Sequence, residues 1–580
     1  MKEEKKLLYF LIILIFVYFI QLPLTNSLPG NCDTYLGLAK LNFYTNNIAS
    51  FFSQSSSSEL MGSRFGESVY FIGLPYIILK LLGVNEITSF YFLLVAIYSL
   101  TAIALYKLSK LYLKSHILSF CSALFFCFSN FTFGHIDDLH IVFYGLIFYS
   151  IYNLKLLHQT GKAKYYTLLL VTSILQIHSS IYNYSVLILS IIIITLINYR
   201  NINFGKKKTL KAIGIFGIIH LIFTLQFIGP RLELKEDKDF YNPWNNKAIA
   251  NIHSFFSLKD FFKKVPGNIY SPNGDIKNAE EELELHAPLI QKGLSEYINP
   301  LSKINKKDIR VPAGNSVYYH QLRRSGFIGY LSLIIILVGL IRIKRLEYNW
   351  EILAFLIIGI TAASGPTFNI GNIPYKTPLF IFYETFDFLS YFRVPTRIYF
   401  MALFSLSILY GFGVSQIMSK LKKSSILLPL IFCLIFLIEN VPLPLRKSVP
   451  PTYPQNLFHK ISSGKVLHLP SQIGFMFFDD SKDYFSYSRE FIYMNWANFH
   501  KLHIANGVNS YFNKPRFELQ SAIDQLNIDA LKNKYGIKYI SIHEHLVIDE
   551  IDKTQVNQFK ELKELGLIKE TQYGKLYKIN

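Results

Sequence analysis

The chain alternates long apolar segments with short polar connections. Eleven apolar runs occur, at residues 7–24, 87–106, 115–133, 140–157, 165–177, 183–198, 212–229, 326–343, 350–364, 397–418 and 425–441. A helix of about 17 to 25 apolar residues can cross the roughly 30 Å hydrocarbon core of a bilayer. The pattern predicts a mainly α, polytopic integral membrane protein with about eleven transmembrane helices, of which the two flanking His178 are short. Residues 69–83 contain Gly73 and Pro75, and there we expect a half-inserted or interfacial helix instead.

Basic residues collect on alternate connections between these runs. They are Lys2, Lys5, Lys6, Lys107, Lys110, Lys114, Lys162, Lys164, Arg200, Lys206, Lys207, Lys208, Lys211, Arg342, Lys344, Arg345, Lys420, Lys422 and Lys423. Cytoplasmic loops of membrane proteins are enriched in Lys and Arg. The intervening short connections, 134–139 and 178–182, contain neither. We therefore expect a multi-pass protein of the cell (inner) membrane, with a cytoplasmic N-terminus and an extracytoplasmic C-terminus.

Composition agrees with this class and removes one alternative. Of the 580 residues 51% are hydrophobic and only 17% are charged, which is unlike a soluble protein. The net charge of +20 comes largely from the lysines that set the topology, so we expect the lipid bilayer and no nucleic acid as a partner. Cys121, Cys127 and Cys433 lie in predicted spans, which leaves no outer disulfide framework.

The polar segments divide the chain into two parts. Residues 1–441 form the predicted transmembrane domain, with outer loops at 25–68 and 230–325. Residues 442–580 have the pattern of a small extracytoplasmic α/β domain. Its strands are expected at "GKVLHLP", "GIKYISIHE" and "GKLYKI", and its helix at "KTQVNQFKELKELG", with the final Gly as a stop.

An acid follows the first span closely. Asp33 lies less than ten residues beyond residue 24, on the face predicted to be extracytoplasmic. A carboxylate there can accept a proton from a hydroxyl nucleophile, a role worth about 10²- to 10⁴-fold in rate. The structural alternative is a solvated loop acid.

The turn "GHIDDLH", residues 134–140, gathers His135, Asp137, Asp138 and His140 on the same outer face. One Asp before a span is a common helix cap. A second Asp and two His exceed that need, and their oxygen and imidazole groups can hold a divalent cation (Mg²⁺, Mn²⁺ or Zn²⁺) or orient a substrate. The spacing of these four residues does not match a four-ligand zinc motif. Two interpretations of the turn therefore remain, a structural helix cap and a metal- or substrate-binding site.

The stretch "YFRVPTRIYF", residues 391–400, enters a predicted span with two arginines. Pro395 suits the first turn of a helix, and Arg393 and Arg397 are four residues apart. Guanidinium groups beside a helix N-terminus bind phosphate well. The alternative is interfacial snorkelling, although these arginines lie on the outer face, against the bias of the other basic residues.

These features together resemble a known superfamily. An outward acid after the first span, an acidic turn between the third and fourth, many spans and an outer C-terminal domain are similar to C-type (GT-C) membrane glycosyltransferases. "GHIDDLH", "FRVPTRIYFMALFSLSILYGFGV", "HKLHIANGVNSYFNKPRF" and "NKYGIKYISIHEH" resemble bacterial YfhO-like membrane proteins. The resemblance implies Asp33 as base and Asp137 and Asp138 as ligands of a metal or of the donor phosphate. The Asp-Asp pair departs from an Asp-x-Asp motif, which leaves the metal open.

The expected activity is hexosyl or pentosyl transfer from a polyprenyl-phosphate-linked donor. The acceptor is a cell-envelope glycan, lipid or protein, and Arg393, Arg397, His135 and His178 are assigned to substrate or phosphate binding. Two other classes stay open, namely a flippase or transporter of lipid-linked saccharide and a non-catalytic membrane scaffold. A carrier should place charged or polar groups near the bilayer midplane. The predicted spans offer His220 and Asn153.

Overall fold

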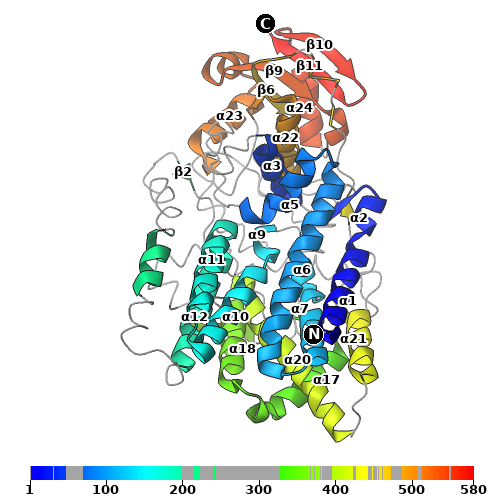
Figure 1. Ribbon diagram of the computed structural model, residues 1–580. Coiled ribbons are helices and arrows are strands. Elements are labelled where there is room, and N and C mark those ends of the chain that lie inside the picture. The colour runs from blue at the N-terminus through cyan, green and yellow to red at the C-terminus, as the bar shows by residue number, and fades with distance from the viewer. Residues whose placement is uncertain are drawn as a thin grey trace.

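The computed structural model describes most of the chain as a helical bundle with a smaller α/β unit at one end (Figure 1). The described residues are 2–29, 32–46, 70–136, 139–198, 214–222, 224, 240–241, 326–365, 367–370, 373–378, 381, 395–421, 426–441, 447–448, 453–454, 456–459, 461–471, 486–505, 512–547 and 550–580.

Within the described residues, four helical segments are long and apolar enough to cross a membrane, namely Glu4–Leu24, Glu86–Leu113, His116–Gly134 and Arg397–Lys420. They are built from α1 (Lys2–Phe19) with α2 (Gln21–Leu24), α6 (Glu86–Leu113), α7 (His116–Cys127) with α8 (Asn130–Gly134), and the 3₁₀ helix η6 (Pro395–Tyr399) with α20 (Phe400–Lys420). Each coincides with a predicted apolar run. The protein is therefore mainly helical, with helices suited to a membrane.

Six shorter helices coincide with further predicted runs. They are α10 (Gly145–Thr160), α11 (Ala163–Ser179), α12 (Ile181–Ile197), α17 (Tyr330–Ile341), α18 (Asn349–Ala363) and α21 (Leu427–Asn440). The run at 212–229 is helical where it is described, at 214–222 and 224. The total of eleven spans stays a prediction.

One predicted span begins later than expected. The run from residue 140 is divided into α9 (Leu139–Val142) and α10, which starts at Gly145. A Cβ added to Gly145 would lie 3.1 Å from backbone atoms of Leu100 and Thr101. The glycine thus lets the start of α10 approach α6 closely, and hydropathy alone does not reveal such a break.

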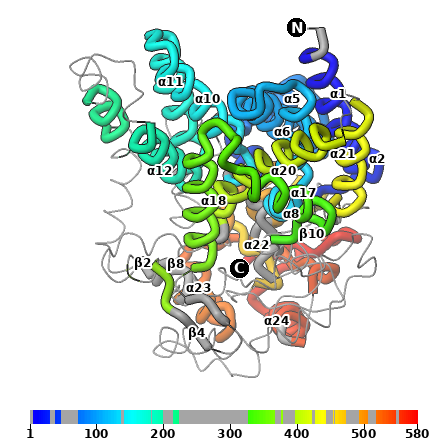
Figure 2. The backbone as a smooth tube through the Cα atoms, turned by 90° about the horizontal axis from the view of Figure 1, so that it is seen from below, coloured from blue at the N-terminus to red at the C-terminus, as the bar shows by residue number. Residues whose placement is uncertain are grey.

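Helix α20 forms the centre of the bundle. Figure 2 views the molecule along the bundle and places α20 among α6, α17 and α18. A Cβ on Gly413 would collide with the carbonyl oxygen of Ile335 in α17, and one on Gly359 of α18 with the backbone of Ala402. Glycines at these crossings allow close helix packing, which is how helices associate in a membrane.

The two ends of the bundle differ, and we name them here. The module end carries α3 (Cys32–Asn46) and α5 (Tyr70–Leu81), and the α/β unit lies beyond these helices (Figure 1). The basic end holds the C-termini of α6, α10 and α12 and the N-terminus of α18. The lysine distribution predicts that the module end is extracytoplasmic. Helix α5 has 12 residues, and a half-inserted or interfacial helix at residues 69–83 stays a prediction.

The α/β unit, which we call the C-terminal module, is built on a five-stranded sheet of order β10-β11-β9-β6-β7. Strand β6 pairs in parallel with β7 and β9, and β11 pairs antiparallel with β9 and β10. The strands are β6 (Lys465–Leu469), β7 (His503–Ile504), β9 (Ile537–Ile542), β10 (Leu565–Thr571) and β11 (Gly574–Ile579), and the helices are α22 (Ser486–His500), α23 (Lys514–Asp524) and α24 (Glu550–Lys560).

The three strands expected in this part of the chain occur as β6, β9 and β11. The expected helix is shorter than its pattern, because α24 ends at Lys560 and Leu565 and Gly566 join β10, opposite Ile579 and Lys578. Sheet pairing therefore overrides the predicted Gly stop. The boundary at residues 441 and 442 stays a prediction.

Short elements complete the described structure. Two-stranded pairs join β1 (Leu28–Pro29) to β5 (Lys447–Ser448), β2 (Phe240–Tyr241) to β8 (Phe512–Asn513), and β3 (Thr367–Ile370) to β4 (Ile373–Lys376). Single helical turns are η4 (Ile343–Arg345), the π-helical η7 (Ala530–Lys534) and η8 (Glu544–Leu546). The predicted outer loop 25–68 contains β1 and α3. Of the loop 230–325, only β2 is described.

Candidate functional site

Asp33, the predicted base, lies in the first turn of α3 at the module end. Its side chain is outside the described residues. The start of α3 is held by Thr34, whose Oγ1 donates a hydrogen bond to the carbonyl oxygen of Pro29 at 2.9 Å. Because β1 pairs with β5, the segment before Asp33 is also tied to the strand that leads toward the C-terminal module.

Helix α3 contacts the segment that follows the predicted acidic pair. A Cβ added to Gly37 would lie 3.2 Å from Cδ1 of Leu139, so α3 and α9 touch at this point. Gly37 is one helical turn after Asp33, and Leu139 directly follows Asp138 in the chain. Asp137 and Asp138 lie outside the described residues, as does the side chain of His140.

His135, at the end of α8, is fully buried. Its ring centroid lies 4.8 Å from that of Phe131, and Phe131 lies 5.2 Å from Tyr399 at the end of η6. Through these rings the turn that contains His135 contacts the segment that contains Arg397. The two candidate segments are 262 residues apart (397 − 135) and meet in the fold.

Arg397 is half-buried at the start of the helix formed by η6 and α20, where Pro395 opens the first turn as the sequence predicts. Its guanidinium carbon lies 4.7 Å above the ring of Tyr182, in cation–π geometry. Tyr182 follows His178 by four residues, and His178 lies in the last turn of α11. Arg393 is outside the described residues.

A hydrogen bond joins the α11–α12 turn to the acidic turn. The Nδ2 of Asn183 donates to the carbonyl oxygen of Ile141 at 2.9 Å, and both residues are buried. Ser180 caps α12 by accepting from the backbone N–H of Asn183 at 3.2 Å. A series of contacts therefore links α3, the segment from His135 to Ile141, the α11–α12 turn and η6 at the module end.

The metal prediction is untested. Among the described residues, no group of three or more His, Cys, Asp or Glu side chains could hold a metal ion. The predicted ligands Asp137, Asp138 and His140 were not part of that set, because their side chains lie outside it. A divalent cation at this turn stays a prediction.

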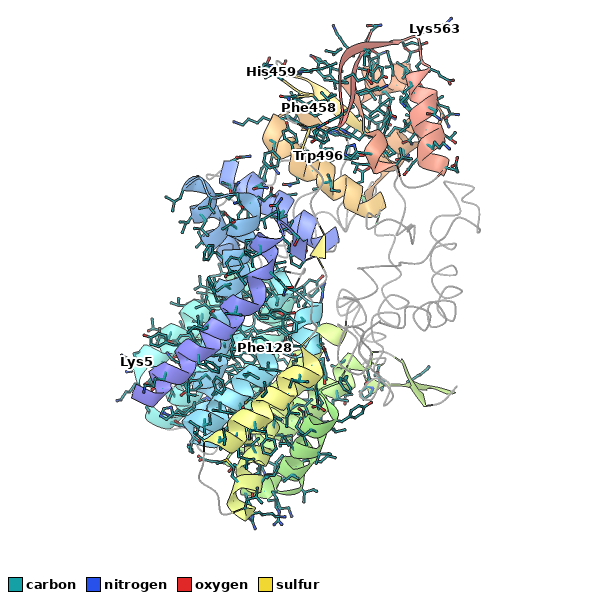
Figure 3. The ribbon with its side chains drawn as sticks, turned by 90° about the vertical axis from the view of Figure 1, so that its right-hand side faces the viewer. Lys5, Phe128, Phe458, His459, Trp496 and Lys563 are labelled. Carbon is teal, nitrogen blue, oxygen red and sulfur yellow. The ribbon has the colours of Figure 1, made fainter. Side chains whose placement is uncertain are left out.

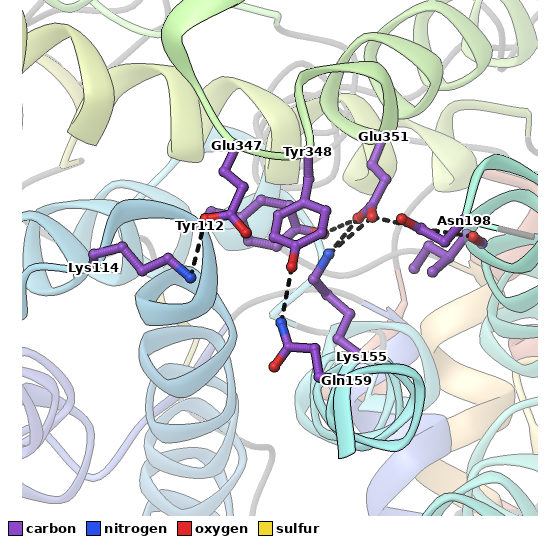
Figure 4. Close-up of polar contacts among 9 residues, drawn as sticks. Tyr112, Lys114, Lys155, Gln159, Asn198, Glu347, Tyr348 and Glu351 are labelled. Atoms are coloured by element: carbon purple, nitrogen blue, oxygen red, sulfur yellow. Dashed lines mark hydrogen bonds and ion pairs between the residues drawn. The ribbon is translucent and has the colours of Figure 1, made fainter. Parts of the chain in front are cut away.

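Sequence reasoning missed a charged cluster at the basic end (Figure 4). Lys155 of α10 and Glu351 of α18 form a buried ion pair, with Nζ 2.9 Å from Oε1 and 2.8 Å from Oε2. Only 3% of the Lys155 side chain and none of Glu351 is exposed. A signal existed, because each is an isolated charge inside a predicted apolar run, and the two charges are opposite.

Neighbouring side chains add hydrogen bonds to Glu351 and aromatic contacts to Lys155. Glu351 also accepts from the Tyr112 hydroxyl at 2.5 Å and from Nδ2 of Asn198 at 2.7 Å. The Lys155 ammonium lies 3.4 Å from the ring centroid of Tyr348 and 4.4 Å from that of Tyr112. We call Tyr112, Lys155, Asn198, Tyr348 and Glu351 the basic-end network. It connects α6, α10, the end of α12 and the start of α18.

The two polar residues singled out in the spans have local partners. His220 lies 3.0 Å from the Ser173 hydroxyl and 2.7 Å from the Tyr184 hydroxyl. Asn153 donates from Nδ2 to the carbonyl oxygen of Tyr149 in its own helix at 2.7 Å. These contacts give both residues a structural role.

The comparisons with known proteins found similarity only to solved structures. No family model matches the sequence, and no curated protein matches it. Among solved structures, the chain is similar to the crystal structure of ArnT from Cupriavidus metallidurans in the apo state, with 97% of each chain covered, a TM-score of 0.35 and 9% identity. At these values, function is argued from the chain's own residues. Membership among YfhO-like proteins stays a prediction.

Proposed function

We propose that this chain is a membrane glycosyltransferase that moves a sugar from a polyprenyl-phosphate-linked donor to an acceptor on the extracytoplasmic face. The meeting of α3, the acidic turn, the α11–α12 turn and η6 at the module end carries the proposal. It rests on the contacts Gly37–Leu139, Asn183–Ile141 and Arg397–Tyr182. These segments contain Asp33 and Arg397 or directly adjoin the predicted acidic pair in the sequence.

The proposed chemistry is a single displacement. The acceptor hydroxyl oxygen attacks the anomeric carbon, and the bond from that carbon to the donor phosphate oxygen breaks. Asp33 takes the hydroxyl proton, and the lipid phosphate leaves with the bonding electron pair. Because attack and departure occur on opposite faces of the sugar, the anomeric configuration inverts.

Arg393 and Arg397 have the role of stabilising the departing phosphate. Negative charge develops there in the transition state, and fixed positive groups at that point usually make the largest catalytic contribution. Arg397 suits this role because it stands at a helix start, where backbone N–H groups also favour an anion. Its contact with Tyr182 restrains the guanidinium before the donor binds.

The basic-end network favours a transferase over a flippase. A carrier opens alternately to the two sides of the membrane. Opening the basic end would separate α10 from α18 and leave Lys155 and Glu351 as buried, unpaired charges, which is strongly unfavourable. A transferase that works at the module end needs no such opening.

The test is transfer by purified protein in lipid vesicles supplied with labelled polyprenyl-phosphate hexose or pentose. We expect Asp33→Asn to lower the rate of sugar release from the lipid by about 10²- to 10⁴-fold, since it removes the proton acceptor. Asp529→Asn, on an exposed acid of the C-terminal module, is the matched control and should keep the full rate. Undiminished transfer by Asp33→Asn would remove the proposed base.

A further inference from the structure

The C-terminal module contacts α3 through a buried polar cluster. Nδ2 of Asn42, in α3, donates to Oδ1 of Asn495, in α22, at 2.8 Å and to Oε1 of Glu86 at 2.9 Å. Nδ2 of Asn495 donates to the same Glu86 oxygen at 3.1 Å. Asn42, Glu86 and Asn495 thus form a closed triangle, which we call the amide triangle, between α3, α6 and the module.

Three hydrogen bonds hold the side chain of Asn42 in place. Its Oδ1 accepts from the Tyr76 hydroxyl of α5 at 2.7 Å, so both amide N–H groups and the carbonyl are used. Only 4% of Asn42 is exposed. A buried amide that makes three hydrogen bonds restrains the backbone that carries it, because any shift breaks several bonds at once.

Two further bonds extend the contact along α3. Nδ2 of Asn498 donates to the carbonyl oxygen of Ala39 at 3.0 Å, and Nδ2 of Asn46 donates to the carbonyl oxygen of Asn498 at 2.9 Å. Ala39, Asn42 and Asn46 are spaced three and four residues apart and so form one face of the helix. That face rests on α22, which lies between the sheet and α3 (Figure 1).

Other residues of α3 pack against the bundle. Gly37 meets Leu139, and a Cβ on Gly73 of α5 would lie 2.5 Å from Cδ2 of Leu41. Helix α22 is itself anchored, because Trp496 is buried among module side chains and lies next to His543 with ring centroids 4.9 Å apart (Figure 3). Helix α3 is therefore held between the bundle and the module.

We propose that Asn495 is a positioning residue. Through Asn42 it sets the position of α3, and hence of Asp33, relative to the acidic turn and Arg397. The C-terminal module would then belong to the catalytic apparatus as the support of its first outer helix. This inference rests on the proposed function, and the experiment below separates the two.

The sharpest variant is Asn495→Asp, which keeps the shape and loses the donor. It places a second carboxylate where an N–H now lies 3.1 Å from Glu86. Two ionised carboxylates at that distance repel. We expect hydrogen exchange of residues 32–46 to rise about tenfold or more, while exchange in the module sheet stays unchanged. We expect kcat to fall about 10- to 100-fold with a smaller change in KM, since misplacing a base affects the chemical step.

A charge swap provides the rescue. Glu86→Gln alone keeps an acceptor oxygen for both asparagines and should have little effect. Combined with Asn495→Asp, it supplies an N–H to the new carboxylate and restores a triangle with one charge. The double variant should recover both slow exchange and kcat. A residue that only stabilises the module would not show this rescue.

Asn527→Ala is the matched control. Asn527 lies in the module and caps η7 by accepting from the backbone N–H of Ala530 at 2.9 Å, away from α3. It should leave exchange of residues 32–46 and kcat unchanged. Unchanged exchange of residues 32–46 in Asn495→Asp, equal loosening of the whole module, or failure of the double variant to restore slow exchange would overturn the inference. If the unmodified protein transfers no sugar, the proposed function fails, and the exchange pattern alone decides whether Asn495 positions α3.

Discussion

The two ends of the bundle are joined by different chemistry. At the basic end, the buried ion pair of Lys155 and Glu351 connects α10 to α18, and two further helices supply hydrogen bonds. At the module end, the ring of Tyr182 lies against Arg397, and asparagine amides join α3 to the Glu86 carboxylate and to the module. The basic end joins two opposite charges directly, whereas these contacts at the module end join a charged group to an aromatic ring or to neutral amides.

The difference bears on which end of the bundle is suited to bind a substrate. Charges that neutralise each other in a buried pair are committed to holding helices together, and are poorly suited to binding a substrate. A guanidinium group can lie against an aromatic ring and bind an anion through its N–H groups at the same time. The basic end thus acts as an anchor, and the module end holds the candidate site.

The largest expected effect is at the anchor. Glu351→Ala should lower the free energy of unfolding by about 3–5 kcal/mol, because Lys155 would be left as a buried charge without its partner. Thermal unfolding in detergent, followed by circular dichroism, measures the loss. The double variant Lys155→Met/Glu351→Leu, which removes both charges, should lose less. Equal losses in the two variants would show that the pairing does not matter.

The contacts within the anchor and within the amide triangle could not be predicted from the sequence. Lys155 and Glu351 are 196 residues apart, and Asn42 and Asn495 are 453 apart. Apolar runs and strand alternation are local patterns, so they predicted most helices and three strands correctly. Which side chains meet depends on how distant helices pack. An isolated charge in an apolar run could only have indicated that a partner exists.

For the candidate site too, local features could be predicted from the sequence and contacts between distant segments could not. The sequence predicted that Pro395 would open a helix beside Arg397, and the structure has η6 there. It gave no indication that α3 rests on α22, because neither helix has a distinctive pattern of charge. The roles of Asp33, Asp137, Asp138 and Arg393 depend on side chains outside the described residues, and they stay predictions.

The next effect tests the module end. Arg397→Ala should lower transfer by about 10²- to 10³-fold, the usual range when one donor to a developing charge is removed. Arg397→Lys should lose less, because it keeps the charge and loses the bidentate geometry. Arg345→Ala, an exposed arginine at the basic end, is the control and should retain full activity. The measurement is the rate of sugar transfer in vesicles with labelled donor, compared among these variants. Equal effects of Arg397→Ala and Arg345→Ala would erase the functional difference between the two ends.

A smaller effect concerns the module that supports α3. Burial lowers the pKa of His543 to about 3, and the carbonyl oxygen of Tyr573 opposes this by accepting from Nδ1 at 3.1 Å. The ring of His468 stacks against those of His500 and His543, and the pKa values of His468 and His500 are also lowered because both are buried. Between pH 6.5 and 3 the unfolded chain binds more protons than the folded one. The free energy of unfolding is therefore greatest above pH 6.5 and decreases as the pH is lowered from 6.5 toward 3.

At pH 5 the loss should be about 2 kcal/mol for His543 alone, relative to pH 7.5. Fluorescence of Trp496, whose ring lies 4.9 Å from His543, can follow thermal unfolding of the module at both pH values. His543→Gln should reduce the pH dependence, and His503→Gln, on the exposed side of β7, should leave it unchanged. A module with the same stability at both pH values would contradict the buried neutral stack.

The smallest expected effect is at an exposed ion pair of the basic end. Lys114 and Glu347 also form an ion pair at the basic end, 3.2 Å apart, but their side chains are 58% and 52% exposed. Lys114→Met should change the free energy of unfolding by no more than about 1 kcal/mol, because water already stabilises both charges and salt screens their attraction. Unfolding at low and high salt checks this, with Lys155→Met as the matched variant. A loss from Lys114→Met as large as that from Lys155→Met would mean that proximity of charge, and not burial, holds this end of the bundle together.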